Sequence, residues 1–191
     1  MRFDDGTAMR LYRQTVEDFG LYPGKELADE EMKQLKEAAG AMSAKMRAVR
    51  IVAASSVSKK DLQRRLVAKG EDPKQAQDAV QWMSDLDLLD DQRVAQQIVS
   101  RCISKGYGLA RAKQALYEKQ IPKCYWDAVL ADYPDQIDEI MQYLREHLGE
   151  KPEQKEKNKV INALIRKGHS YGVIRRAMER LSYDADDIPE E

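Results

Sequence analysis

Cysteine is scarce in this chain of 191 residues, which contains only Cys102 and Cys124. Two thiols cannot supply the disulfide framework that holds small secreted domains together. Long apolar runs are missing as well, since none approaches the roughly 18 consecutive residues of a membrane helix, and residues 1–5 lack the apolar segment of a signal peptide. We therefore expect a cytoplasmic protein with no membrane partner.

Aromatic residues and net charge are also low. The chain has 2 Trp, 9 Tyr and 2 Phe, and its formal net charge is −1, so the total charge gives no general attraction to nucleic acid or to an anionic membrane. Hydrophobic residues nevertheless make up 42% of the chain, which is enough to build a core. Ala, Leu, Gln, Lys and Glu, all good helix formers, are abundant and predict an all-α fold.

Motifs that would indicate catalysis are absent. The sequence has no Gly-x-x-x-x-Gly-Lys-Ser/Thr phosphate-binding loop. Its Cys and His residues lie more than twenty residues apart, unlike the short paired spacings of a zinc site. We interpret both thiols as buried apolar side chains and His147 as a partner of a helix C-terminus. The sequence therefore predicts no catalytic residues, no cofactor, no metal and no enzymatic activity.

The charges are distributed unevenly along the chain. Residues 46–131 contain 15 Lys and Arg against 10 Asp and Glu, a net charge of +5, while the two flanks together have a net charge of −6. Contact with an anionic partner is therefore expected in the middle of the chain.

An internal repeat of about 49 residues accounts for most of the chain. Three similar helix ends with the pattern Leu-x-x-Lys precede Gly70, Gln120 and Gly168, at spacings of 50 and 48 residues. The apolar periodicity predicts one helix before and one after each of these helices. The predicted domains are three three-helix repeats at 41–89, 90–134 and 135–183. Because one such repeat buries little apolar area by itself, we expect an elongated tandem array.

Two further segments lie outside the repeats. Asp5-Gly6 is a favoured turn pair between short extended runs, and residues 14–19 suggest a short helix that stops at Gly20. We therefore predict an N-terminal extension at 1–40, with a small β-hairpin and a short helix. Residues 184–191 are predicted to form a solvated acidic tail.

Cationic side chains recur in the predicted repeats and could follow a phosphate backbone or an acidic protein groove. Helical proteins also commonly expose Lys and Arg to solvent, so a solvated face is the simpler interpretation for any single residue. The candidate contacts with a partner or with DNA are Arg64, Arg65, Lys69, Arg101, Lys105, Arg111, Lys113 and Lys119.

Three runs of residues carry a resemblance to a known family: Leu-Leu-Asp-Asp-Gln-Arg-Val-Ala at 88–95, Lys-Gly-Tyr-Gly-Leu-Ala-Arg at 105–111, and Leu-Tyr-Glu-Lys-Gln-Ile at 116–121. They look like the signature of RecX, the regulatory family of the bacterial RecA recombinase. The resemblance extends from about Met46 to the last predicted helix. Gln120 stands where the family usually has Gly, which would cost about 1 kcal/mol if this position is left-handed.

The resemblance implies a non-enzymatic regulator that binds the RecA recombinase, or its filament on single-stranded DNA, and mainly inhibits strand exchange and ATP turnover. Contact with single-stranded DNA would then come through the filament, with weak direct binding to DNA in addition. The alternative is a helix-turn-helix protein that binds DNA directly. Against this alternative, a net charge of −1 predicts only modest affinity for phosphate at physiological salt.

Overall fold

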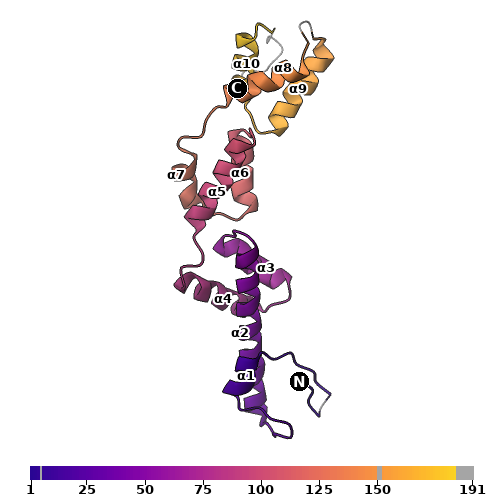
Figure 1. Cartoon of the computed structure of the whole chain (residues 1–191), viewed down its shortest axis with the longest axis vertical. Coiled ribbons are helices and arrows are strands. Elements are labelled where there is room, and N and C mark those ends of the chain that lie inside the picture. Colours follow the sequence, from indigo (N-terminus) through magenta and orange to yellow (C-terminus); the bar gives the residue numbers. More distant parts are fainter. Residues whose placement is uncertain (5, 150–151, 184–191) are drawn as a thin grey trace. The chain divides into compact units, whose positions relative to one another are not determined.

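Helices form all of the regular structure in the part of the chain that the computed structural model describes, residues 1–4, 6–149 and 152–183. Within these residues there are ten α-helices and one short 3₁₀ helix (Figure 1), which confirms the predicted all-α class. The chain divides into two compact units, Met1–Asp90 and Asp91–Glu191. The predicted acidic tail at 184–191 lies outside the described residues.

The predicted N-terminal β-hairpin is not supported as a pair of strands. No strand is present in the described residues, where Arg2 and Ala8 form only a single antiparallel bridge. The amides of Phe3 and Met9 donate to the carbonyls of Thr7 and Met1, both at 2.9 Å, so the two arms of the turn are hydrogen-bonded without forming regular strands. A hairpin this short has too few cross-strand pairs to form regular strands. Asp5, half of the predicted turn pair, lies outside the described residues.

The first unit contains α1 (Arg13–Asp18), α2 (Asp29–Ala54), α3 (Lys59–Ala68) and α4 (Pro73–Asp85). The short helix predicted at 14–19 is confirmed as α1. Helix α2 is continuous from Asp29, so it runs through residues 40 and 41, where the sequence places a domain boundary. Gly40 lies in this helix where a Cβ atom would collide with the side chain of Gln75 on α4.

Small residues let α2 and α4 approach each other closely in the core of the first unit. Ala44, Ala48, Ala76 and Ala79 are at most 1% exposed, and they pack with larger side chains such as Leu62 of α3. Side chains cap two of the helix starts: Ser58 accepts a hydrogen bond from the amide of Asp61 at 3.0 Å, and Asp72 accepts two at the start of α4. These caps and alanines fix how the three helices meet.

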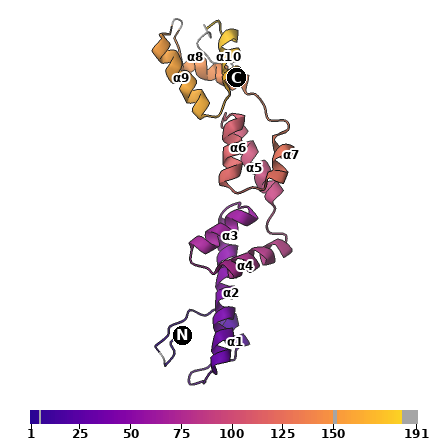
Figure 2. The ribbon, with the colours of Figure 1, turned by 180° about the vertical axis from the view of Figure 1, so that it is seen from behind.

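The second unit contains two groups of helices (Figure 2). The first comprises α5 (Asp91–Ser104), α6 (Leu109–Glu118), the 3₁₀ helix η1 (Lys123–Tyr125) and α7 (Trp126–Leu130). The other comprises α8 (Ile137–His147), α9 (Gln154–Arg166) and α10 (Tyr171–Arg180). Each group has its own apolar cluster. We refer to α2–α4, α5–α7 and α8–α10 as the first, second and third three-helix groups.

The end of the second group differs from the sequence prediction. The sequence predicts a helix after the helix end at Gln120, but Pro122 is extended, with ψ 138°, and only residues 126–130 form an α-helix. Cys124 lies in the intervening 3₁₀ helix and is exposed, so its interpretation as a buried filler is wrong. Cys102 is buried, as expected, and burial raises the pKa of its thiol. The irregular turn therefore brings one of the two thiols to the surface.

The middle helix of each three-helix group ends in the same hydrogen-bonded turn. Gly70, Gln120 and Gly168 follow α3, α6 and α9 with φ angles of +89°, +55° and +91°. The amide of the next residue donates to the carbonyl five residues earlier, in the pairs Glu71–Leu66, Ile121–Leu116 and His169–Leu164, at 3.1, 3.0 and 3.2 Å. These are Schellman-type ends, which favour glycine at the left-handed position.

Replacing Gln120 with Gly is expected to stabilise the protein by up to about 1 kcal/mol, because a side chain at a left-handed backbone position is strained. Urea unfolding at an unchanged m-value measures the gain. Gln114→Gly on the same helix is the control and should lower stability by about 0.5–1 kcal/mol, since its backbone is helical. A loss of stability in Gln120→Gly would show that its left-handed backbone carries no strain.

Candidate functional site

Arg64 and Arg65 lie on α3 and both contact Asp61 of the same helix. Arg64 Nη2 is 2.6 Å from Asp61 Oδ1, and Arg65 Nη2 is 2.8 Å from Asp61 Oδ2. The carboxylate is completely buried, whereas the two arginine side chains are 60% and 31% exposed. The buried carboxylate therefore anchors both guanidinium groups at the surface and neutralises part of their charge.

A shallow cleft of about 360 Å³ lies between the C-terminal part of α2 and α3. We call it the basic cleft, because four of its seven lining residues are cations and none is acidic: Arg47, Arg50, Ile51, Ala54, Ser55, Arg65 and Lys69. The cleft thus brings together two of the three candidates predicted on α3 and adds two arginines from α2.

Neighbouring groups hold the two α2 arginines in place. Arg47 Nε is 2.6 Å from Glu71 Oε1, and Arg47 Nη1 donates to the carbonyl of Lys69 at 3.2 Å. Arg50 Nη2 donates to the hydroxyl of Tyr12 at 2.8 Å. Neither arginine is among the contact residues predicted from the sequence. Their spacing of three residues near the C-terminus of a helix was the available signal, since it places both side chains on one face.

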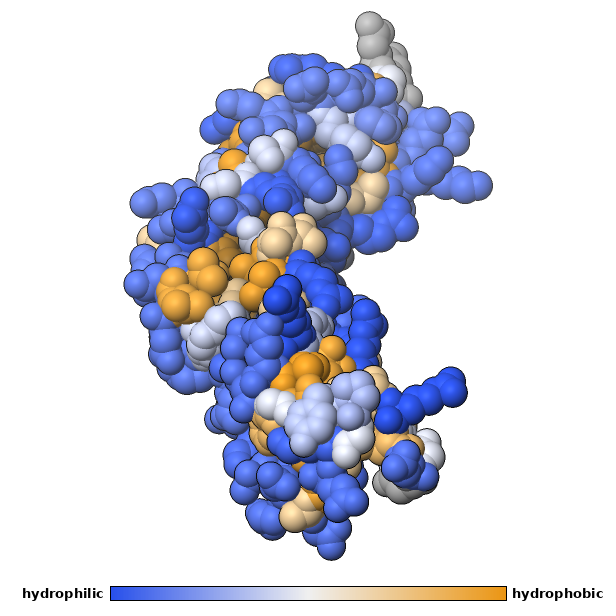
Figure 3. Space-filling model, turned by 60° about the horizontal axis from the view of Figure 1, so that its bottom comes forward, coloured by the Kyte–Doolittle hydropathy of each residue, from blue (hydrophilic) through white to orange (hydrophobic). Residues whose placement is uncertain are grey.

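The cleft remains positively charged after its ion pairs are counted. Its four lining cations and the neighbouring Arg64 carry five positive charges. The two buried carboxylates Asp61 and Glu71 contact three of these cations, which leaves a net charge of +3. Hydrophilic side chains also cover most of the face shown in Figure 3, with hydrophobic patches between them. A cleft of this kind attracts phosphate or carboxylate groups, and the attraction weakens as salt is added.

The five remaining candidates lie on α5 and α6 or at their ends: Arg101, Lys105, Arg111, Lys113 and Lys119. They do not meet in one cleft. Lys105 and Lys113 line two different cavities. Arg111 Nη1 lies 3.7 Å from Glu118 Oε1 on the same helix, a long and exposed ion pair that contributes little to stability.

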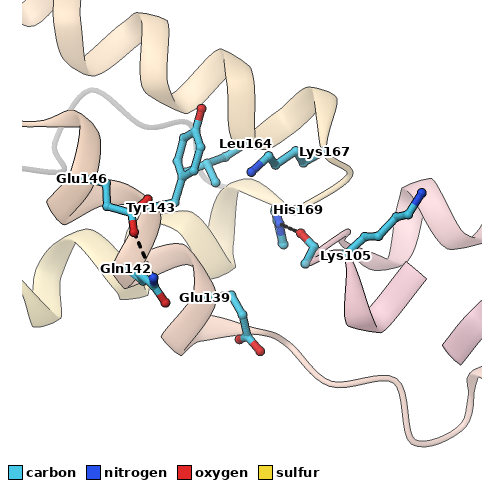
Figure 4. A pocket seen from close by; sticks show the side chains of 9 residues that line it. Lys105, Glu139, Gln142, Tyr143, Glu146, Leu164, Lys167 and His169 are labelled. Carbon is cyan, nitrogen blue, oxygen red and sulfur yellow. Dashed lines mark hydrogen bonds between the residues drawn. The ribbon is translucent and has the colours of Figure 1, made fainter. Parts of the chain in front are cut away.

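The cavity beside Lys105 has a volume of about 180 Å³ and is shown in Figure 4. Its lining combines Lys105 and Lys167 with Glu139 and Glu146, so its charges balance. Lys167 Nζ is 3.9 Å from the centre of the Tyr143 ring, a cation–π contact. This cavity is therefore less suited to an anion than the basic cleft.

His169 is a buried residue at the edge of this cavity. It is 6% exposed, and its Nε2 lies 3.0 Å from the carbonyl oxygen of Gly106, to which a neutral ring can donate. Burial lowers the pKa of His169, although the Gly106 carbonyl and Glu139 act in the opposite direction and Lys167 adds to the lowering. The neutral imidazole is therefore the form that the fold favours.

His147 lies in the last turn of α8, with Nδ1 2.8 Å from the carbonyl oxygen of Tyr143. This position agrees with its interpretation as a partner of a helix C-terminus.

Among the described residues, no three His, Cys, Asp or Glu side chains are grouped so as to hold a metal ion. In the same part of the chain, no helix has the length and apolar character needed to cross a membrane.

Comparison with known proteins identifies the family. A family model of the second three-helix domain of RecX matches residues 90–130, and one of the third domain matches residues 135–178. Residues 90–178 thus match two successive domains of the RecX family. The resemblance seen in the sequence is thereby confirmed.

Two curated relatives carry the same family name. The regulatory protein RecX of Clostridioides difficile strain 630 is 25% identical over 192 residues, covering 97% of this chain and 90% of the relative. The regulatory protein RecX of Vibrio campbellii is 28% identical over 149 residues, covering 76% of this chain and 94% of the relative.

Solved RecX structures share the fold. A crystal structure of regulatory protein RecX aligns with a TM-score of 0.66 at 19% identity, covering 93% of this chain and 91% of the other. The crystal structure of RecX from Lactobacillus salivarius aligns with a TM-score of 0.65 at 19% identity, covering 75% and 97% respectively.

Asp61→Asn is expected to lower the free energy of unfolding by about 1–3 kcal/mol, because the amide cannot replace a buried carboxylate that contacts two guanidinium groups. Urea denaturation measures the loss. Asp78→Asn, at an exposed position on α4, makes the same chemical change and should stay within about 0.5 kcal/mol of the parent. Equal stabilities of the two variants would contradict an anchoring role for Asp61.

The stability of the second unit should fall as the pH drops below about 6.5, the ordinary pKa of histidine. The folded-state pKa of His169 is lowered, so the unfolded chain takes up the proton first, and stability is fully present only above this range. Urea unfolding from pH 5 to 8 should show a steeper acid-side loss for the parent protein than for His169→Gln, whose amide can still donate to Gly106. Identical pH profiles would exclude His169 as the source.

Proposed function

We propose that this protein binds the RecA recombinase, or the RecA filament on single-stranded DNA, and modulates it, mainly by inhibiting strand exchange and ATP hydrolysis. The observation that carries the proposal is the match of two successive RecX domains in this chain. RecX is the regulatory family that the sequence resembles through its runs at 88–95, 105–111 and 116–121, and the resemblance implies RecA as the partner.

The basic cleft supports a contact with an acidic surface of the filament. Its arginines are held by Glu71, Asp61 and Tyr12, so they need little ordering when a partner arrives, and preorganised cations lose less entropy on binding. Arg101, Lys105, Arg111, Lys113 and Lys119 are proposed as further contacts along the second group. A series of three-helix groups suits a long partner, because each group can meet a successive part of it.

Direct DNA binding is the second candidate function. The observation that favours it is again the basic cleft, since guanidinium groups pair well with phosphate oxygens. The low net charge of the chain argues against strong binding to DNA alone at physiological salt. Fluorescence polarisation of labelled single-stranded and duplex DNA, with and without the cognate recombinase, separates the two. Tight binding to naked duplex would favour the alternative.

The deciding experiment is a titration of this protein into the DNA-dependent ATP hydrolysis of the cognate recombinase. Inhibition at far fewer than one copy per recombinase subunit would indicate capping of filament ends. Inhibition only near one copy per subunit would indicate occupation of the filament groove. An unchanged rate of hydrolysis, together with no effect on strand exchange, would exclude the proposed function.

Charge reversal in the basic cleft should weaken the inhibition. The double variant Arg50→Glu with Lys69→Glu avoids Arg47 and Arg65, the two lining residues that pair with buried carboxylates, so the fold should be retained. We expect it to require about tenfold more protein for half-inhibition of ATP hydrolysis.

The matched control for this variant is Lys33→Glu with Lys36→Glu. It changes the net charge by the same amount at exposed positions on the N-terminal part of α2, away from the cleft lining. Its inhibition should stay close to that of the parent. Equal losses in both double variants would show that net charge, and not the cleft, determines binding.

A further inference from the structure

The turn between α5 and α6 meets the turn between α9 and α10, backbone against backbone. The amide of Gly108 donates to the carbonyl of Lys167 at 2.9 Å, and the amide of Ala110 donates to the carbonyl of Gly168 at 3.2 Å. In the opposite direction, His169 Nε2 lies 3.0 Å from the carbonyl oxygen of Gly106. These three hydrogen bonds join the second three-helix group to the third, and we call them the backbone joint.

The joint leaves no room for a side chain at either of its central glycines. A Cβ atom on Gly108 would overlap the carbonyl of Gly168, and a Cβ atom on Gly168 would overlap the backbone amide of Arg111. Because the obstacles are backbone atoms, they cannot rotate away as a flexible side chain could. Close contact of the two turns therefore requires glycine at both positions.

The linker between the two groups returns to the same turn. The hydroxyl of Tyr133 donates to the carbonyl of Tyr107, and Gln136 Nε2 donates to the carbonyl of Ile103 at 2.9 Å. Gln136 is only 3% exposed, and it holds a left-handed backbone with φ +54°. Gln136 thus binds a carbonyl group in the last turn of α5, where helix carbonyls lack partners within the helix, and Tyr133 binds a carbonyl group in the turn that follows.

The corresponding turn of the first group has no such restriction. Gly70 has nearly the same left-handed backbone as Gly168, with φ +89° against +91°, yet a Cβ atom there would meet nothing within 4 Å. The close approach at Gly168 is therefore a property of the joint and not of the helix end itself.

We propose that the second and third three-helix groups act as one rigid recognition body, in which Gly108 and Gly168 are positioning residues. They fix the cationic side chains of one group relative to those of the other; Lys105 and Lys167, one from each side of the joint, line the same cavity. The rigidity of this body can be tested on the isolated protein, without a partner. Its importance for recognition rests on the proposed function.

The rigidity can be measured by double electron–electron resonance between two spin labels. One label is placed on the exposed Cys124 of the second group and the other on Asn162→Cys, an exposed position of α9, while Cys102 is buried and should not react. The Asn162→Cys protein, labelled at residues 124 and 162 and otherwise unchanged, serves as the parent and should give one narrow distance distribution. A broad distribution in the parent would overturn the proposal.

Two alanine variants, each with a matched control, isolate the joint. Gly108→Ala is paired with Gly149→Ala, because neither backbone is left-handed and only Gly108 is blocked. Gly168→Ala is paired with Gly70→Ala, because both are left-handed and only Gly168 is blocked. Gly108→Ala and Gly168→Ala should broaden the distance distribution and speed amide exchange at residues 108 and 110, while both controls keep the parent behaviour. Narrow distributions in all four variants would overturn the proposal.

Tyr133→Phe tests the joint without adding atoms, in case an alanine variant does not fold. It removes the hydrogen bond to the Tyr107 carbonyl and should loosen the joint. The amides in the middle of α5 and α9 should keep their protection against hydrogen exchange. Unchanged amide hydrogen exchange at residues 108 and 110 would contradict a role of the joint in holding the two groups together.

Inhibition of the recombinase provides a separate readout. Gly108→Ala should need about tenfold more protein for half-inhibition of ATP hydrolysis than Gly149→Ala, because a loosened body must be ordered on binding. Equal inhibition by a variant whose joint is shown to be loose would overturn the recognition role. If the parent protein itself does not inhibit, the proposed function fails, while the resonance and exchange experiments still decide whether the body is rigid.

Discussion

The left-handed turn at the end of each middle helix is the constraint on which the rest of the structure depends. It reverses the chain at Gly70, Gln120 and Gly168, so that the third helix of each group can pack back on the first two. The residue that follows is buried in all three groups: Glu71, Ile121 and His169. One backbone position thus recurs with a carboxylate, an aliphatic side chain and an imidazole, and the chemistry of each group differs accordingly.

Each of these buried residues connects the turn to a different part of the molecule. Glu71 holds Arg47 in the basic cleft, and Ile121 completes the apolar cluster of the second group. His169 reaches Gly106 across the backbone joint. A repeated fold therefore supports different local functions, because the left-handed turn keeps the helices in place while the following side chain is free to vary.

Much of the fold could be predicted from the sequence, because helix periodicity, N-terminal caps and left-handed ends are local signals. Ser58, Asp72 and Gly168 mark helix limits where the structure has them. The failures occurred where local signals were weak: the N-terminal turn forms a single bridge, and the chain after Pro122 forms a 3₁₀ turn that exposes Cys124. The boundaries of the three predicted repeats remain predictions.

By itself, the sequence determined the helical class, the three similar helix ends and the resemblance to RecX, all of which depend on neighbouring residues and short motifs. Only the tertiary structure decided which polar groups from distant parts of the chain meet. Arg47 reaches Glu71 from another helix, and His169 reaches Gly106 over 63 residues of chain. Contacts of this range depend on how packed helices are oriented, and small residues at the points of closest approach set that orientation, so residue spacing alone cannot specify them.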